Sequence, residues 1–375
     1  MSQTPFIEHV HIRGFRSLSD VELSEISMAT VLIGANGSGK SNFIRFFEML
    51  SWMLRSRRLG EFIDRQGGAD DQLFGGNRVT PRMEAELSIR TKAGRNDYRF
   101  ALSYAQPDRF IFTDESFRFS RPSFHTEAAW QPLDSGHREA KIVEVAQTDD
   151  YPGASKTAST IVYLLRSIAA YQFHDTSYES NFKKKWDVSD NRQLRSDGGN
   201  LAAVLYRLEQ EDVRAYEDIC RQIGRVLPGF DRFAIEEEYG KVLLRWKAKW
   251  TDKTFGAHVT SDGSLRAFAL VTLLRMPAEM LPDVVLLDEP ELGLHTSAVG
   301  LVGSMIASRS CERQIIVATQ SPQLVDTFDI DQIFVMDLEE GQTRCRKLSR
   351  DAYDHWLESY STGELWEKNV LGGRP

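Results

Sequence analysis

The sequence predicts a mixed α/β fold with an antiparallel β lobe and a helical insertion. Three observations lead to this class. A glycine-rich loop joins a short apolar strand to an amphipathic helix near the N-terminus. A second apolar run ends in two adjacent carboxylates, at residues 288 and 289. Helix-like and strand-like patterns also alternate after residue 265, which is typical of a parallel or mixed sheet covered by helices.

Composition and charge exclude several classes of protein. The 375 residues are 41% hydrophobic and 27% charged, which is ordinary for a folded chain with a substantial core. We expect no membrane span and no signal peptide, and the three scattered cysteines fit a reducing cytoplasm. The net charge of −8 argues against a protein that coats nucleic acid over its whole surface. A local basic patch is still allowed.

The N-terminal elements follow from short hydrophobic patterns. Phe6–Gly14 and Leu18–Leu23 alternate as strands do, and Arg16 lies in the turn between them. Ala29–Ile33 is a continuous apolar run, as expected for a buried parallel strand. The helical spacing of apolar residues then predicts a helix over Asn42–Leu59.

The middle of the chain predicts a β lobe followed by helices. Four strand-like segments between residues 84 and 146 (MEAELSIRT, DYRFALSY, RFIFTDESFRF and KIVEVAQ) indicate an antiparallel sheet. Helices are expected over Thr157–Ala170 and Asn200–Leu227, and a strand pair over Phe233–Trp250 with a turn near residue 240.

The C-terminal part alternates between helices and strands. The expected elements are Leu265–Leu274, Val284–Leu287, Thr296–Arg309, Gln314–Ala318 and Gln332–Asp337. We divide the chain into an N-terminal lobe (1–155), a helical insertion (156–230) and a C-terminal lobe (231–375). There is no internal repeat and no heptad run long enough for a coiled-coil arm.

The segment Gly34–Ser41 matches the phosphate-loop pattern G-x-x-x-x-G-K-[ST] without a mismatch. It follows a strand and precedes a helix, which is the context that the motif requires. Glycines let backbone N–H groups face phosphate oxygens. The lysine charge attracts the phosphates, and the serine hydroxyl is a ligand for Mg²⁺. The predicted ATP-binding residues of this loop are Asn36, Gly37, Ser38, Gly39, Lys40 and Ser41, with Ser41 also a metal ligand.

The run VVLLDEP delivers Asp288 and Glu289 at the carboxyl end of a buried strand. Ligands bind at this edge of open α/β sheets. We predict that Asp288 holds Mg²⁺ and that Glu289 is the catalytic base that orients and deprotonates the attacking water.

Ser261-Asp262-Gly263 opens a predicted helix 27 residues before Asp288. This helix start favours binding of an anion, because it combines a serine cap, a glycine that permits close approach, and free N–H groups. The pattern resembles the signature motif of ABC-type ATPases, which reaches the nucleotide held by a second subunit. Ser261 and Gly263 are therefore candidate ATP contacts.

Nearly the whole chain resembles the RecF/SMC/OLD-type branch of the ABC ATPases. The likeness lies in FRSLSDVEL, VLIGANGSGKSN, SDGSLRAFALVTLL, VVLLDEPELGLH and VATQSPQLVD. YQFHDTS, DGGNLAAVL and the ending GELWEKNVLGGRP resemble a bacterial "predicted ATPase" (AAA family ATPase) group linked to defence operons. The resemblance implies a phosphate-loop NTPase head that dimerises, or forms a higher oligomer, over two ATP molecules.

The resemblance also suggests roles for residues outside the main motifs. Gln320 stands where the branch usually has a histidine switch, so hydrolysis is expected to be slow. His295 is either a contact to the other subunit's site or a capping residue. Gln172 is the candidate sensor of Mg²⁺ and water, with Gln72 as the alternative, and Arg16 resembles an arginine that lies near the nucleotide.

Two remaining features bear on partners. Basic residues gather at Arg55–Arg58 and at Lys183–Lys185, either as solvated faces or as a groove for DNA or RNA phosphates. The aromatic segment after Asp354 either docks as a final helix or forms a partner surface. Asp329 and Asp331 are not taken as a nuclease metal pair, because too few residues follow them for that domain.

The sequence therefore predicts a cytoplasmic ATPase head that controls a separate effector, such as a nuclease, in bacterial anti-phage defence. The link to defence depends on the resemblance alone. Two alternatives stay open: a RecF-like repair ATPase that acts directly on DNA, and a non-hydrolysing scaffold that uses ATP as dimer glue. No contact with a membrane is expected.

Overall fold

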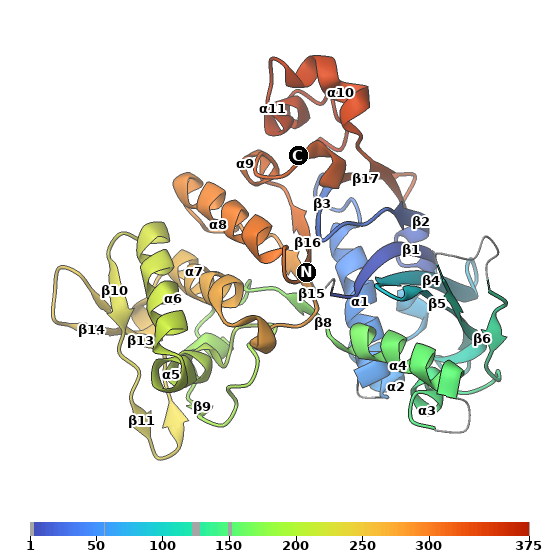
Figure 1. Ribbon diagram of the computed structural model, residues 1–375, viewed down its shortest axis with the longest axis horizontal. Coiled ribbons are helices and arrows are strands. Elements are labelled where there is room, and N and C mark those ends of the chain that lie inside the picture. The colour runs from blue at the N-terminus through green and yellow to red at the C-terminus, as the bar shows by residue number, and fades with distance from the viewer. Residues whose placement is uncertain (1–3, 56, 122–127, 149–151, 375) are drawn as a thin grey trace.

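The computed structural model describes residues 4–55, 57–121, 128–148 and 152–374. Two six-stranded sheets dominate it, one central and mixed and the other antiparallel. Figure 1 shows the antiparallel lobe on one side of the central sheet, a helical region on the other, and a small C-terminal helical segment at the top. The predicted α/β class is confirmed.

The central sheet has the strand order β18-β17-β3-β16-β15-β8. Its strands run parallel except β18, which pairs with β17 in the antiparallel sense. Their bounds are β3 (Ala29–Ile33), β8 (Ile168–Tyr171), β15 (Val284–Asp288), β16 (Gln314–Thr319), β17 (Ile333–Glu339) and β18 (Gln342–Lys347). The order places strands from both ends of the chain side by side.

Alternate side chains of this sheet enter two separate cores. On β15, Val284 and Leu286 join the core on the side of the antiparallel lobe. Val285 and Leu287 join the core on the side of the helical region. Because successive residues of a strand point to opposite faces, a continuous apolar run is what a strand buried on both faces requires.

The antiparallel lobe has the order β2-β1-β4-β5-β6-β7. It lies next to three helices, α1, α2 and α4 (Figure 1), and its strands β1 and β2 also contact the central sheet directly, as in the hydrogen bond from the Thr343 N–H to the Ser17 carbonyl at 2.8 Å. The bounds are β1 (Phe6–Phe15), β2 (Leu18–Ser24), β4 (Arg82–Thr91), β5 (Gly94–Ala105), β6 (Arg109–Ser120), β7 (Gln131–Pro132), α1 (Lys40–Arg55), α2 (Leu59–Arg65) and α4 (Pro152–Arg166).

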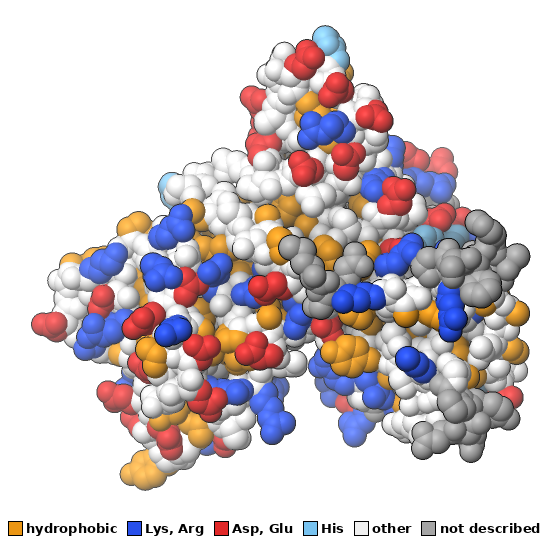
Figure 2. Space-filling view, viewed as in Figure 1, with side chains coloured by type: hydrophobic (Ala, Val, Ile, Leu, Met, Phe, Trp, Pro, Cys, Tyr) orange, Lys and Arg blue, Asp and Glu red, His pale blue; other side chains and the backbone are white. Residues whose placement is uncertain are grey.

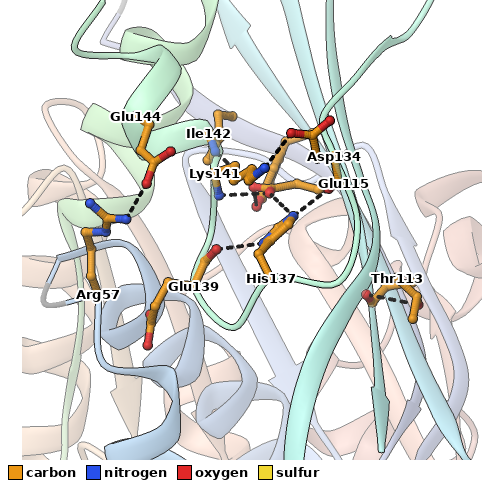
Figure 3. A network of polar contacts seen from close by, with 11 residues as sticks. Arg57, Thr113, Glu115, Asp134, His137, Glu139, Lys141, Ile142 and Glu144 are labelled. Atoms are coloured by element: carbon orange, nitrogen blue, oxygen red, sulfur yellow. Dashed lines mark hydrogen bonds and ion pairs between the residues drawn. The ribbon is translucent and has the colours of Figure 1, made fainter.

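The fourth strand predicted for this lobe, KIVEVAQ, is instead the short helix α3 (Ile142–Val145). The buried Glu115 carboxylate of β6 accepts hydrogen bonds from the backbone N–H groups of Lys141 (2.9 Å) and Ile142 (3.2 Å), as Figure 3 shows. It also accepts the Tyr98 hydroxyl at 2.8 Å. A carboxylate at a helix start offsets the unpaired N–H groups there. This partner is distant in sequence, so the local apolar pattern did not indicate it.

The insertion is built from two helices, α5 (Leu201–Glu211) and α6 (Val213–Val226), with two small sheets beside them. The predicted helix over 200–227 is broken at Asp212, which caps α6 by accepting the Ala215 N–H. The strand pair predicted over 233–250 is divided: β10 ends at its start, β11 and β12 form a hairpin about residue 240, and β13 follows. The strands of the two small sheets are β9 (Trp186–Asp187), β10 (Phe230–Phe233), β11 (Glu237–Glu238), β12 (Lys241–Val242), β13 (Arg245–Ala248) and β14 (Thr254–Gly256).

The predicted helix over 157–170 also differs from the structure. Helix α4 ends at Arg166, and the chain continues directly into β8, which pairs with β15. Hydrogen bonding of β8 to a strand over 100 residues away overrides the local helical spacing. The division into segments 1–155, 156–230 and 231–375 remains a proposal.

Five further helices complete the C-terminal half. They are α7 (Asp262–Arg275), α8 (Thr296–Arg309), α9 (Pro322–Val325), α10 (Arg350–Leu357) and α11 (Thr362–Glu367). Trp366 of α11 is fully buried and donates its ring N–H to the Gly373 carbonyl at 2.5 Å. Trp356 of α10 is 45% exposed. The aromatic segment thus docks through α11 and leaves part of α10 exposed.

Within the described ranges, no helix combines the length and the apolar character needed to cross a membrane.

Candidate functional site

The loop between β3 and α1 encloses the Lys40 ammonium group. Lys40 is only 5% exposed, and its Nζ donates hydrogen bonds to the carbonyls of Gly34 (2.6 Å) and Ala35 (2.9 Å). Burial lowers the pKa of Lys40, while the carboxylates of Glu289 and Asp288 oppose that shift. The Lys40 Nζ also donates to the Ser38 hydroxyl at 3.5 Å. A buried ammonium group with only neutral oxygen partners is well placed to donate to phosphate oxygens.

Gly39 allows the loop to turn beneath strand β18. Its φ of 103° lies in the region that side chains disfavour. A Cβ at this position would lie 2.0 Å from the Thr343 hydroxyl oxygen. Strand β18, which the sequence did not predict, therefore supports the loop from outside.

Asp288 lies at the carboxyl end of β15 and is 5% exposed. Its Oδ2 accepts a 2.8 Å hydrogen bond from Gln172 Nε2, while its buried Oδ1 has no partner among the described residues. Burial and the nearby Glu289 charge raise the pKa of Asp288, and the Ser41 hydroxyl and Gln172 oppose that shift. An unpartnered carboxylate oxygen beside a hydroxyl fits Mg²⁺, which takes oxygen ligands.

Glu289 follows Asp288 with a φ of 46°. This uncommon backbone conformation turns its side chain toward Thr319-Gln320, which we call the switch segment. The Glu289 N–H donates to the Ala318 carbonyl at 2.8 Å. Gln320 Nε2 donates to Glu289 Oε1, and also to Asn36 Oδ1 at 2.7 Å. The candidate base, the switch residue and the phosphate loop thus form one hydrogen-bonded group.

A third carboxylate, Glu291, was not predicted. Its Oε1 accepts the Thr319 hydroxyl (2.6 Å) and the Gln320 backbone N–H (3.0 Å). Its Oε2 is buried without a partner in the described part of the chain, and burial raises its pKa. Glu291 therefore holds the backbone of the switch segment. The string Asp-Glu-Pro-Glu, which places a third acid two residues after the Asp-Glu pair, was the available signal.

The predicted signature segment begins helix α7. Ser261 Oγ accepts the Ser264 N–H at 3.3 Å, and both Ser261 and Asp262 are exposed. A Cβ on Gly263 would lie 2.3 Å from the Gly293 carbonyl oxygen, so only glycine permits this contact with the loop after Glu291. The start of α7 faces outward, where a second subunit could reach it.

Arg266 ties the signature helix to the segment that follows β8. Its guanidinium donates to the carbonyls of Phe173 (3.1 Å) and His174 (3.0 Å). The signature helix is therefore connected to Gln172, the residue that contacts Asp288. Such a connection allows a movement at one motif to reach another.

The remaining candidates have other partners. His295 caps α8, because its Nδ1 accepts the Ser297 N–H at 3.3 Å, as the capping interpretation expected. Gln72 is fully buried and accepts a 3.0 Å hydrogen bond from Arg16 Nε, so the structure does not bring it to Asp288. Burial, reinforced by the charge of Arg45, lowers the pKa of Arg16. A nucleotide contact by Arg16 or His295 stays a prediction.

Comparisons with known proteins identify the family. The family described as "AAA domain, putative AbiEii toxin, Type IV TA system" matches residues 29–326, and the chain belongs to that family. It is an ABC-type ATPase of the RecF/SMC-like branch. The resemblance found in the sequence is thereby confirmed.

Relatives found by sequence match a shorter part of the chain. The chain is 34% identical over 87 residues to the "DNA replication and repair protein RecF" of Anaeromyxobacter dehalogenans strain 2CP-C, which is 23% of each chain. It is 30% identical over 97 residues to the protein of the same name from Microcystis aeruginosa, covering 25% of this chain and 26% of that protein. The chain thus spans about a quarter of the length of these relatives.

Solved structures share the fold over almost the whole chain. An SMC head bound to the C-terminal winged-helix domain of ScpA superposes with a TM-score of 0.61 at 16% identity, covering 92% of this chain and 99% of that one. The Smc head domain from Pyrococcus furiosus, bound to the C-terminal domain of ScpA, gives 0.56 at 16% identity, with 95% and 99% covered. At this identity the likeness establishes the fold alone.

Proposed function

We propose that the chain binds ATP with Mg²⁺ and hydrolyses it. The observation that carries this proposal is the meeting of three groups at one edge of the central sheet. These are the buried Lys40 ammonium, the unpartnered Asp288 oxygen and the Glu289 carboxylate held by Gln320. Magnesium would neutralise phosphate charge when it is bound by Asp288 and Ser41.

The protein's own residues account for the rest of the proposed reaction. Lys40 places its charge among the loop N–H groups, where it attracts the β- and γ-phosphates. Glu289 accepts the proton of the attacking water, and Gln320 orients it through the side-chain amide. Because Gln320 has neither charge nor a titratable proton, we expect turnover at the low end of about 1–10³ s⁻¹ or below it.

Dimerisation over two ATP molecules is the second part of the proposal. The exposed start of α7, with Ser261 and Gly263, offers unpaired N–H groups to a γ-phosphate held by another subunit. The contact between Gly263 and the loop at Gly293 supports a role for both segments at such an interface. The proposed dimer would work in the cytoplasm and control a separate effector, such as a nuclease, in anti-phage defence.

The experiment compares the wild-type protein with two variants. Lys40→Ala should abolish ATP binding, measured by calorimetry. Glu289→Gln should bind ATP but not hydrolyse it, and should therefore accumulate as a dimer in light scattering with ATP and Mg²⁺. Glu340→Gln, in an exposed turn, is the matched control and should behave as wild type. Unchanged ATP affinity in Lys40→Ala would contradict the assignment of the loop.

The RecF relatives favour a second candidate, a repair ATPase that acts directly on DNA. Hydrolysis by the isolated chain that increases with DNA, together with repair activity without a partner, would select it. Co-purification with an effector encoded nearby, whose activity depends on Glu289, would select effector control instead.

A third candidate is a scaffold that uses ATP only as glue between two subunits. Gln320 in place of a charged switch favours it, while Glu289 argues against it. The absence of measurable phosphate release by a wild-type ATP-bound dimer would select this candidate.

A further inference from the structure

The segment of residues 361–374 contacts two parts of the candidate nucleotide site, although the proposed function gives it no role. It contains helix α11 and the string GELWEKNVLGGR, and it has no part in the phosphate loop, the signature segment or the switch segment. In Figure 1 it lies at the top of the molecule, where α11 is next to α9. We call it the 361–374 segment.

The inner and outer faces of this segment differ in chemistry. Leu365, Trp366 and Leu371 are fully buried, whereas Glu364 and Glu367 are exposed. Figure 2 shows Asp and Glu side chains gathered over this top part of the molecule. The apolar side chains therefore fix the segment against the rest of the fold, while its acidic side chains face water.

One end of the 361–374 segment packs against the helix that follows the switch segment. The Gly363 N–H donates to Asp326 Oδ1 at 2.6 Å. A Cβ on Gly363 would lie 2.4 Å from the Pro322 carbonyl oxygen, so the contact requires glycine. Pro322 begins α9 and lies two residues after Gln320, whose side chain donates to Asn36 Oδ1 at 2.7 Å. Helix α11 thus holds the backbone through which the chain leaves the switch segment.

The other end of the segment packs against the start of the phosphate loop. A Cβ on Gly373 would lie 2.5 Å from Val335 Cγ1 and 3.5 Å from the Gly34 Cα, so the backbones of the two glycines approach closely. Gly34 is also close to β17, since a Cβ on Gly34 would lie 2.1 Å from the Met336 carbonyl oxygen. The start of the phosphate loop therefore contacts both β17 and the 361–374 segment, two residues before Asn36.

The two contacts are connected through Trp366. Its ring Nε1 donates to the Gly373 carbonyl at 2.5 Å, and its side chain is fully buried between them. Arg346 of β18 holds the intervening chain, because its Nη2 donates to the Leu371 carbonyl at 2.5 Å. A displacement at one end of the segment is therefore transmitted to the other end through a short chain of hydrogen bonds.

We propose that the 361–374 segment positions Gln320 of the switch segment relative to Asn36 of the phosphate loop, and thereby sets the rate of hydrolysis. Each of these two residues lies two positions from a backbone that the segment contacts, and their side chains share one hydrogen bond. Misplacement of a group by about 1 Å from a distant change is enough to lower a rate about 100-fold. The positioning residues are Gly363, Trp366 and Gly373.

The kinetic part of this proposal rests on the proposed ATPase function, because Gln320 matters for rate only if the chain hydrolyses ATP. The contacts themselves do not depend on that function. The experiments therefore include one that needs no nucleotide.

Two glycine variants separate positioning from general stability. Gly363→Ala displaces the chain that leaves the switch segment, so it should lower kcat about tenfold or more with little change in KM for ATP. Gly373→Ala displaces the phosphate loop, so it should instead raise KM about tenfold or more. The controls are Gly224→Ala in α6, where the nearest atom to a Cβ is 3.7 Å away, and Gly240→Ala, which has a positive φ of 74° but open space around it. Both controls should keep the wild-type constants.

Hydrogen exchange without nucleotide tests the contacts. Trp366→Phe keeps an aromatic side chain but removes the donor to the Gly373 carbonyl. Amides within 34–38 and 320–325 should then exchange about fivefold faster, as expected from the loss of one intramolecular hydrogen bond. Trp356→Phe in α10, where the side chain is 45% exposed, is the matched control and should exchange as wild type does. Amides of α6 should be unchanged in both variants.

Three results would overturn the proposal. One is wild-type exchange in Trp366→Phe, and another is faster exchange throughout the chain, α6 included, which would show a role in global stability alone. The third is the same pattern of change in kcat and KM for Gly363→Ala and Gly373→Ala. If a glycine variant does not fold, the rate of hydrolysis by Trp366→Phe, expected below that of Trp356→Phe, decides in its place.

Failure of the proposed function is distinguishable from failure of this proposal. A wild-type protein that binds ATP without hydrolysing it would show that the proposed function has failed. The exchange experiment would then decide alone whether the 361–374 segment holds the phosphate loop and the switch segment.

Discussion

Replacing Glu291 tests how the switch segment is held. Glu291→Ala removes the acceptor of the Thr319 hydroxyl and of the Gln320 N–H. Thr319 is fully buried, so its hydroxyl cannot turn to water instead. Leaving two such donors without an acceptor should cost about 2–4 kcal/mol in the free energy of unfolding. The thermal midpoint of a chain of this length should then fall by about 2.5–5 °C.

Glu291→Gln is the matched control, because its amide oxygen accepts both hydrogen bonds. The substitution also removes a buried carboxylate whose Oε2 has no partner within the described residues. Burial raises the folded pKa of Glu291 above its unfolded value of about 4.3. The folded state therefore binds more protons between these two pKa values, and wild-type stability falls as the pH rises through that window.

Denaturation midpoints of the three proteins, measured between pH 4 and pH 8, test this reasoning. The stability of Glu291→Gln relative to wild type should increase with pH until the folded pKa is passed, and then stay constant. If the proposed ATPase function holds, Glu291→Ala should lower kcat more than it changes KM for ATP, and Glu291→Gln should restore kcat. Equal midpoints for wild type and Glu291→Ala would refute the role of Glu291, as would a Glu291→Gln protein as unstable as Glu291→Ala.

Three further predictions concern other parts of the molecule. Gln320→His should leave phosphate release unchanged or increase it; a fast wild-type enzyme slowed by this change would show that Gln320 has its own catalytic geometry. Gly39→Ala should weaken ATP binding about tenfold or more in calorimetry, since its Cβ would meet Thr343, whereas Gly256→Ala, with open space around it, should not. Glu115→Ala should lower the unfolding free energy by about 3 kcal/mol in urea, because it leaves the Tyr98 hydroxyl and two N–H groups of α3 unpaired; an unchanged midpoint would refute the account of α3.

Local patterns in the sequence were sufficient to predict the motifs and the class of protein that contains them. The order strand, glycine loop, helix is contiguous over Ala29–Arg55, so each step constrains the next. The run of apolar residues before Asp288 likewise indicated a strand buried on both faces. These features depend on backbone conformation and side-chain periodicity within about ten residues, which a sequence displays directly.

The elements that local patterns predicted wrongly, or did not predict, also have identifiable causes. KIVEVAQ forms a helix because Glu115, 26 residues away, accepts its first N–H groups. Strand β8 ends the helix predicted over 157–170 because it pairs with β15. Strand β18 was not predicted, although it closes over Gly39. In the first two cases a long-range partner outweighs the local preference, whereas β18 pairs with its neighbour β17 in a hairpin.

The sequence by itself determined a phosphate loop, a strand that ends in Asp288 and Glu289, and an ATPase class that contains both. The tertiary structure alone decided that Gln172 rather than Gln72 contacts Asp288, that Glu291 holds the switch segment, and that the 361–374 segment contacts both the phosphate loop and α9. The physical reason is the order of the central sheet, β3-β16-β15-β8. Strands that lie far apart in the chain become neighbours when the sheet assembles and both of its faces are buried. Their order is therefore selected by packing and not by local periodicity.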